Sequence, residues 1–236
     1  MKKALSTLIS FSALAATISI ASALIASPAK ALQLTFDNIT GNSAINATAG
    51  ENQLFLDVTD ASGGENLSAN QVLFKFTNAG PAASSITQIY FDDFANLLGI
   101  ASIADSGAGV SFVQNTGNLN LPGGNTVSFT PDLGVKATAP IQPNGVNPGE
   151  WVSVLFNLKA GQTLQNVFAD LADRDLRVGF HVQGFANGGS ESFVNNPPSG
   201  GGGGGVSVPE PASMVGLGLV GAALMASRRR KLDKTA

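Results

Sequence analysis

Apolar and polar residues alternate along several short stretches between residues 32 and 196, and this period of two constrains the fold more than any other feature. Successive side chains of a β-strand point to opposite faces, so such alternation is typical of half-buried strands. Clusters of Gly, Asn, Asp and Pro separate the stretches, as turns would. The clearest examples are residues 32–36, 54–59, 72–76, 151–158 and 176–183.

Weaker patterns predict further strands at residues 84–92, 108–115, 124–130 and 190–195. About eight or nine short antiparallel strands in one domain favour two packed sheets. We therefore expect a mainly β fold, a single antiparallel β-sandwich over residues 32–196 with jelly-roll-like connectivity.

One segment has helical spacing instead. Its apolar residues are Leu164, Val167, Phe168 and Leu171, at positions i, i+3, i+4 and i+7. This predicts one short helix over 163–172, with Thr163 as the N-cap, lying across an end or edge of the sandwich. The stretch 90–99 (YFDDFANLLG) is interpreted as a second helical turn.

Residues 1–31 have the three parts of a secretory signal peptide. Two lysines precede an apolar run that extends to about residue 26, and Ala29-Lys30-Ala31 forms a small-x-small cleavage pattern. We expect cleavage after Ala31, so that the mature chain begins at Leu32. An uncleaved N-terminal membrane anchor is the alternative.

The C-terminal region divides into a linker and an apolar segment. Residues 197–207 contain two prolines and six consecutive glycines, which predicts a flexible tether with a reach of roughly 20 Å. Residues 212–226 carry no charge; as a transmembrane helix they would span about 22 Å, so flanking residues must complete the crossing. Basic residues follow at once, which places residues 232–236 in the cytoplasm and the body outside.

This C-terminal arrangement resembles the PEP-CTERM sorting signal of bacterial envelope proteins, over residues 208–231. The resemblance rests on Pro209, Glu210 and Pro211, on the short apolar helix, and on the membrane stop formed by Arg228, Arg229, Arg230 and Lys231. It implies processing by an exosortase, removal of the tail near the Pro-Glu-Pro, and an association with exopolysaccharide and biofilm matrix. A permanent C-terminal anchor is the alternative.

Composition limits what the body can bind. Residues 32–206 contain fourteen acidic and five basic side chains, a net charge of −9. Nucleic-acid binding requires a basic footprint, so we expect no nucleic-acid partner. The chain has no cysteine, which excludes a Cys nucleophile and Cys-ligated metal sites.

The sequence offers little for catalysis. His181 is the only histidine, and no Gly-x-Ser-x-Gly motif accompanies it, so we expect no Ser-His-Asp triad. Asp92 and Asp93 are adjacent and would point to opposite faces of a strand, which does not suit a glycosidase pair. We therefore predict that the body is not an enzyme.

Two acidic loops are candidates for a structural calcium ion, the one cofactor considered. Calcium binds six to eight oxygen ligands, often carboxylates. The first candidate set is Asp170, Asp173 and Asp175; the second is Asp57, Asp60, Glu65 and Asn66. Neither set has the spacing of an EF-hand, and both also fit solvated turns.

Aromatic platforms for sugars are few, because the body has one tryptophan, Trp151, and one tyrosine, Tyr90. Trp151 falls opposite the apolar face of its strand, where it is either exposed or capping the core.

We predict an exported protein with a structural or interaction role and a transient inner-membrane anchor. Its final place would be the cell surface, outer envelope or extracellular matrix. The alternative is a secreted carbohydrate-binding module or carbohydrate-active enzyme. Expected partners are the secretion machinery, exosortase, and exopolysaccharide or matrix proteins.

Overall fold

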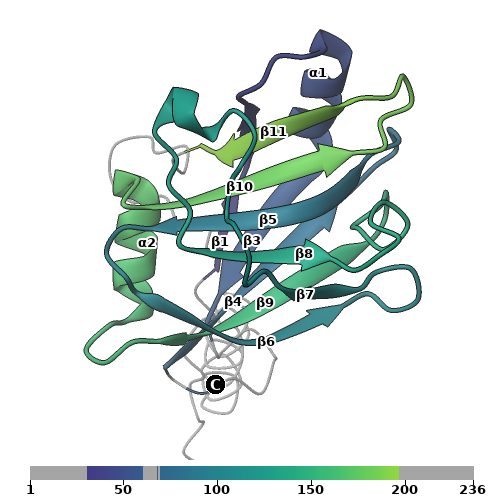
Figure 1. Cartoon of the computed structure of the whole chain (residues 1–236). Coiled ribbons are helices and arrows are strands. Elements are labelled where there is room, and N and C mark those ends of the chain that lie inside the picture. The colour runs from purple at the N-terminus through teal and green to yellow at the C-terminus, as the bar shows by residue number, and fades with distance from the viewer. Residues whose placement is uncertain (1–30, 61–67, 69, 197–236) are drawn as a thin grey trace, which may run out of the picture.

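The computed structural model describes residues 31–60, 68 and 70–196 (Figure 1). The predicted linker, sorting signal and transmembrane helix lie outside these residues, as does the signal peptide apart from Ala31. Within the described ranges, no helix has both the length and the apolar character needed to cross a membrane.

The described chain forms two antiparallel sheets (Figure 1). The five-stranded sheet has the order β1 (Ala31–Leu34), β3 (Leu54–Thr59), β4 (Gln71–Asn78), β9 (Trp151–Leu158) and β6 (Leu98–Asp105). The six-stranded sheet has the order β2 (Phe36–Asn38), β11 (Ser190–Asn195), β10 (Leu176–Gln183), β5 (Ser85–Asp93), β8 (Leu133–Ala137) and β7 (Phe112–Gln114).

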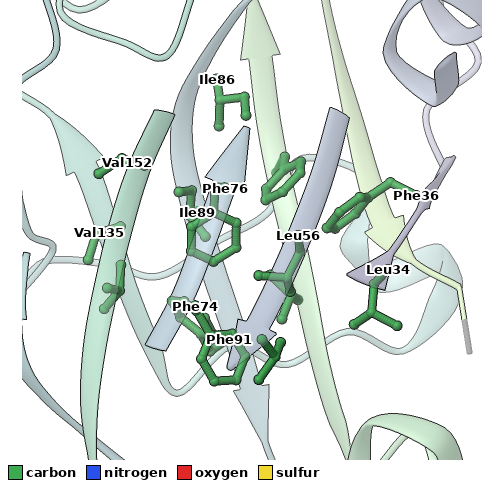
Figure 2. Close-up of a cluster of buried hydrophobic side chains, with 14 of the residues drawn as sticks. Leu34, Phe36, Leu56, Phe74, Phe76, Ile86, Ile89, Phe91, Val135 and Val152 are labelled. Atoms are coloured by element: carbon green, nitrogen blue, oxygen red, sulfur yellow. The ribbon is translucent and has the colours of Figure 1, made fainter. Parts of the chain in front are cut away.

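A shared core of phenylalanine rings joins the two sheets face to face (Figure 2). Phe91 of the six-stranded sheet packs edge-on against Phe74 and Phe156 of the other sheet, with the Phe91–Phe156 centroids 4.9 Å apart. Phe76 and Phe180 make a similar contact at 5.5 Å. Edge-to-face pairs of this kind contribute about 0.5–1.5 kcal/mol each beyond simple burial. The inward residues are those that the period-two pattern predicted, which confirms a mainly β fold of two packed sheets; the jelly-roll connectivity stays a prediction.

The predicted strand at 32–36 is divided between the two sheets. β1 pairs with β3, whereas β2 pairs with β11, and the chain crosses from one sheet to the other at Thr35. Alternation continues through the crossing because Leu34 and Phe36 both face the common core. The pattern therefore identified the buried side chains but could not locate the change of sheet.

The segment 115–132 differs from the prediction of a strand at 124–130. It contains a 3-10 helix, Gly124–Val127, and lies over the outer face of the six-stranded sheet. There Leu121 and Phe129 pack with Tyr90 and Val194 in a second apolar cluster. Gly179 makes this close approach possible, since a Cβ at that position would lie 2.6 Å from Leu121 Cδ2.

The helical turn predicted at 90–99 is wrong. Residues 90–93 end β5, a tight turn follows, and β6 begins at Leu98. The Asp93 carboxylate accepts hydrogen bonds from the backbone N–H groups of Leu97 and Leu98, both at 2.9 Å. These bonds fix a connection of strand, turn and strand. Its sequence resembles the start of a helix, which explains the wrong prediction.

The expected helix near 163–172 is confirmed as α2 (Leu164–Asp173), and Thr163 is its N-cap. The expectation of a single short helix is wrong, because α1 (Ala44–Gln53) is a second one. The residues that α1 buries are Asn46, Gly50 and Gln53, so it has no apolar stripe for a periodicity argument to detect.

The chain leaves the sandwich at the end where α2 lies. β11 is antiparallel to β10 and runs back toward the start of β10, which follows α2 (Figure 1). β1 begins opposite Thr59, the last residue of β3, and so starts from the same side. We call this the α2 end; the loops before β5, before β9 and after β10 form the opposite end.

Candidate functional site

A pocket of about 420 Å³ lies at the end of the sandwich opposite α2, where β5 begins and β10 ends. Three loops form it, and we call it the loop-end pocket. It is lined by Pro81, Ala83, Ser84, Ser85, Gln142, Pro143, Asn147, Pro148 and Gly184. Its volume falls within the range of small-molecule sites.

The floor of the pocket is formed where the β8–β9 loop lies directly on β5. Ser84 and Ser85 are buried there, and Ser85 Oγ donates a hydrogen bond to the Gln142 carbonyl at 2.8 Å. A Cβ on Gly145 would lie 2.2 Å from Ser85 Oγ and 2.6 Å from the carbonyl oxygen of Ile86. Only glycine allows the two segments to approach this closely, so Gly145 sets the depth of the floor.

A buried amide network holds the loop 79–84 in place behind the pocket. Gln53 Nε2, which carries two N–H groups, has three acceptors within hydrogen-bond distance: Asn78 Oδ1 at 2.9 Å, Ser84 Oγ at 2.6 Å and the Ala82 carbonyl at 2.8 Å. Gln53 Oε1 accepts from the Ala82 N–H at 3.0 Å. Asn78 Nδ2 in turn donates to Ser84 Oγ and to the Val146 carbonyl, at 3.0 and 3.2 Å. Buried networks that are this well satisfied make a structure rigid, so the pocket is preformed.

The rim is apolar on one side and amide-bearing on the other. Pro81, Pro143 and Pro148 are exposed and present ring carbons. Asn147 is fixed by Glu150, whose Oε2 accepts from the Asn147 N–H at 2.8 Å and from Nδ2 at 2.9 Å. This arrangement leaves Asn147 Oδ1 as an acceptor.

The Gln142 side chain is the most adaptable polar group of the pocket. It is exposed, and among the described residues its amide makes no hydrogen bond. It lies across Gly184, where a Cβ would be 3.6 Å from Gln142 Oε1. Gly184 has a φ of +69°, a backbone conformation that favours glycine, whereas a Cβ at this position would make only an ordinary contact with Gln142.

Sequence reasoning did not identify this pocket. The stretch 139–149 is rich in Pro, Asn and Gly, which indicates a loop. Nothing in it shows that the loop meets residues 81–85 and Gly184, because these contacts depend on the pairing of β5 with β10.

His181 lies on β10, a central strand, and is half-buried. Its Nδ1 is 3.2 Å from Gln88 Oε1, and burial lowers the pKa of the imidazole below its ordinary value. Ser192 is directly opposite His181 in register, but its Oγ is buried and has no hydrogen-bond partner in the described chain. The two side chains therefore do not form the nucleophile–base pair of a triad.

Asp92 and Asp93 are both committed to structure at the α2 end. Asp92 forms an ion pair with Arg177 and accepts a hydrogen bond from the Thr130 N–H at 3.0 Å. Asp93 caps the β5–β6 turn, as described above. They line a smaller hollow of about 280 Å³ beside the exposed ring of Phe94.

The proposed calcium residues Asp170, Asp173 and Asp175 lie around the end of α2 and the start of β10. Burial raises the pKa of Asp170, and the negative charges of Asp175, Asp93 and Asp173 raise it further. In the described part of the chain, no three acidic or histidine side chains form a group that could hold a metal ion. Of the second set, Asp57 accepts from Gln33 Nε2 at 2.8 Å, and Glu65 and Asn66 lie outside the described residues.

The two aromatic candidates have different environments. Trp151 is half-buried on the outer face of the five-stranded sheet, and Lys75 Nζ lies 4.8 Å from the centroid of its ring. A lysine in this position is attracted to the ring face and occupies it. Tyr90 is buried in the second apolar cluster, where desolvation raises the pKa of its hydroxyl.

Comparison with known proteins identifies one region. The family model described as the PEP-CTERM protein-sorting motif matches residues 207–231. No curated protein and no solved structure matches the chain. The matched range contains the predicted processing residues Pro209, Glu210 and Pro211 and the basic cluster that begins at Arg228, while the cleavage positions and the signal-peptide site at Ala29 and Ala31 stay predictions.

The body has no assigned family. The motif is recognised by exosortase and directs membrane-associated processing toward the cell surface. The chain is therefore an exported protein that carries the PEP-CTERM sorting motif at its C-terminal end.

Proposed function

We propose that the sandwich is a non-enzymatic interaction domain of the cell surface or extracellular matrix, where it associates with exopolysaccharide. An exosortase removes the tail near Pro209–Pro211 after transient anchoring in the inner membrane. The match to the sorting motif at residues 207–231 is the observation that carries this proposal.

The positions of the chain exit and the pocket, at opposite ends of the sandwich, support an outward-facing role. The chain leaves the sandwich at Asn196, at the α2 end, and the loop-end pocket lies at the other end. The predicted linker, residues 197–207, lies between the sandwich and the Pro-Glu-Pro, and its composition predicts a reach of roughly 20 Å. Once the tail is removed and the chain is held at its new C-terminus, the pocket end is the part that is free to meet a partner.

The groups that a hydrolase would need are engaged elsewhere. Asp92 and Asp93 stabilise the Arg177 contact and the β5–β6 turn, and His181 contacts Gln88. These contacts support an interaction role over a carbohydrate-active enzyme. One observation supports the second candidate, a carbohydrate-binding module: the lining of the loop-end pocket is neutral and carries amide groups.

Intact mass measured on protein from the membrane fraction and from the surrounding matrix tests the sorting step. We expect matrix protein that begins at Leu32 and lacks every residue after the Pro-Glu-Pro. A triple variant, P209A/E210A/P211A, should retain Arg228–Ala236 and stay in the membrane fraction. The matched control P197A/P198A changes two prolines of the linker and should be processed normally.

Two results would contradict the proposal. Wild-type protein that keeps Arg228–Ala236 and occurs only in membranes would show a permanent anchor. Processed protein that washes out of the matrix without any retained polysaccharide would contradict the association with exopolysaccharide while leaving the sorting step intact.

A further inference from the structure

We infer that the loop-end pocket binds an uncharged, hydroxyl-rich ligand, a sugar unit of a neutral polysaccharide. The inference rests on the proposed function and deepens it by naming the ligand class and the residues that recognise it. It is carried by the residues that line the pocket, by the hydrogen-bonding capacity they leave unused, and by the charge of the surroundings.

The pocket presents both kinds of hydrogen-bonding group that a sugar hydroxyl can use. The free amide of Gln142 offers two N–H donors and a carbonyl acceptor, and Asn147 Oδ1 offers a second acceptor. Ser85 Oγ donates to the Gln142 carbonyl and keeps its lone pairs. A hydroxyl both donates and accepts, so neighbouring hydroxyls of one sugar ring can satisfy these groups together.

The apolar part of the rim suits the C–H face of the same ring. Pro81, Pro143 and Pro148 surround the amides with ring carbons, and Ala83 adds a methyl group. A pocket that is mostly apolar, with a few placed polar groups, gives both affinity and orientation to a small ligand. A sugar unit has this combination of C–H surface and hydroxyl groups.

The charge distribution disfavours an anionic ligand. Every lining residue is neutral, so no Lys or Arg is present to pair with a carboxylate or phosphate. The nearest charged group in this hydrogen-bond network is the Glu150 carboxylate, which is bonded to Asn147. The body as a whole has a net charge of −9 over residues 32–206, and this field repels acidic polysaccharides.

The rigidity of the walls keeps the cost of binding low. The network of Gln53, Asn78 and Ser84 fixes the loop that carries Pro81 and Ala83, and Gly145 fixes the loop that carries Gln142. A preformed site does not need to be ordered by the ligand. Only the Gln142 side chain must adopt a fixed rotamer on binding.

The test is isothermal titration of the full-length chain, purified in detergent, so that binding does not depend on sorting. The probes are neutral cello-, xylo- and manno-oligosaccharides and acidic fragments of alginate and polygalacturonate of matched length. We expect binding of at least one neutral probe and none of the acidic ones. Ala83→Trp should abolish it by filling the pocket, and Gln142→Ala should weaken it about tenfold, the equivalent of one or two lost hydrogen bonds.

Matched controls carry the same changes elsewhere. Ala95→Trp places the ring in the exposed turn at the α2 end, and Gln114→Ala removes an exposed amide on β7; both should bind as the wild type does. Binding of acidic probes, neutral binding that survives Ala83→Trp, or no binding of any probe would each overturn the inference. None of these results affects the mass and fractionation experiment, so failure of the pocket inference is distinguishable from failure of sorting.

Discussion

The two helices are held to the sandwich by opposite kinds of interaction. α2 inserts Val167 and Leu171, both fully buried, into the main core. α1 buries two polar residues, Asn46 and Gln53, and the glycine Gly50, whose missing side chain makes room for the Phe193 ring. Apolar burial holds α2, whereas directional hydrogen bonds at its two ends hold α1.

The N-terminal end of α1 is fixed by the buried carboxylate of Glu191. It accepts hydrogen bonds from the N–H groups of Asn42 and Ser43, at 3.1 and 2.6 Å, and from the side chains of Thr40 and Asn38, at 2.5 and 3.1 Å. The positive end of the helix dipole also favours a negative charge there. The C-terminal end is fixed by Gln53, which is neutral.

The difference matters for function because the two helices border different parts of the molecule. Gln53 is the last residue of α1 and also the centre of the network that shapes the loop-end pocket. α2 contacts β10 at the other end of the sandwich. Damage to α1 should therefore reach the pocket, and damage to α2 should lower stability and leave the pocket unchanged.

Gln53→Ala should have the largest effect. It removes the amide that donates to this set of acceptors through two N–H groups and accepts from the Ala82 N–H, and it leaves polar groups of Asn78, Ala82 and Ser84 without this partner, for a loss of about 4 kcal/mol in the free energy of unfolding. Urea unfolding measures the loss, and the exposed Gln114→Ala should stay within about 0.5 kcal/mol of the wild type. A loss below about 1 kcal/mol would show that the network does not hold α1.

Leu171→Ala should cost about 3 kcal/mol, because it leaves a cavity where α2 enters the core. Binding of the neutral sugar probe should not change at a temperature where the variant remains folded. The comparison between the helices fails if Leu171→Ala weakens sugar binding as much as Gln53→Ala does.

Glu191→Gln should cost about 2 kcal/mol at pH 7, since the amide presents an N–H group to backbone donors. Burial alone raises the pKa of Glu191, but the bonds from Thr40, Asn38, Asn42 and Ser43 outweigh it and hold the pKa below its ordinary value. The stability that the carboxylate contributes is therefore present above the ordinary pKa of 4.5 and is lost as the pH falls through the lower folded value.

Urea unfolding of Glu191→Gln and wild type across this range of pH gives the check. The difference between the two proteins should shrink as the pH falls below 4.5, the ordinary pKa of the group. A difference that stays constant with pH would mean that the charge of Glu191 does not stabilise the N-terminal end of α1. Gln53→Ala provides the contrast, because its loss involves neutral groups and should not follow this titration.

The same contrast explains what the sequence could predict. Strand alternation located the inward residues of β3, β4, β9 and β10, and helical spacing located α2, since apolar burial leaves a periodic trace. The two polar residues that hold α1, Gln53 and Glu191, are more than a hundred residues apart in the sequence, so they leave no periodic pattern. The pocket is also built from distant loops, so only the sorting signal, a local motif, could be identified as a site.

The smallest expected effects concern the two N-caps. Thr163 Oγ1 and the Asn166 side chain form a reciprocal capping box at the start of α2, with the Thr163 N–H donating to Asn166 Oδ1 at 3.0 Å. The Thr163 hydroxyl accepts from the Asn166 N–H at 3.3 Å and also donates to Asn166 Oδ1 at 2.7 Å. Ser43 Oγ makes two long bonds only, accepting from the Asn46 N–H at 3.4 Å and from Asn187 Nδ2 at 3.3 Å.

Thr163→Ala should therefore cost about 1 kcal/mol and Ser43→Ala about half of that, as measured by urea unfolding. Both variants keep the backbone bond of the cap residue, from the Ser43 N–H to Glu191 and from the Thr163 N–H to Asn166 Oδ1, so the two changes compare the hydroxyl groups alone. The reverse order would show that α1 depends on its own cap more than on the carboxylate. If Glu191→Gln and Ser43→Ala together cost less than the sum of the two, the cap and the carboxylate act as one unit, because the first change already removes part of what the second would remove.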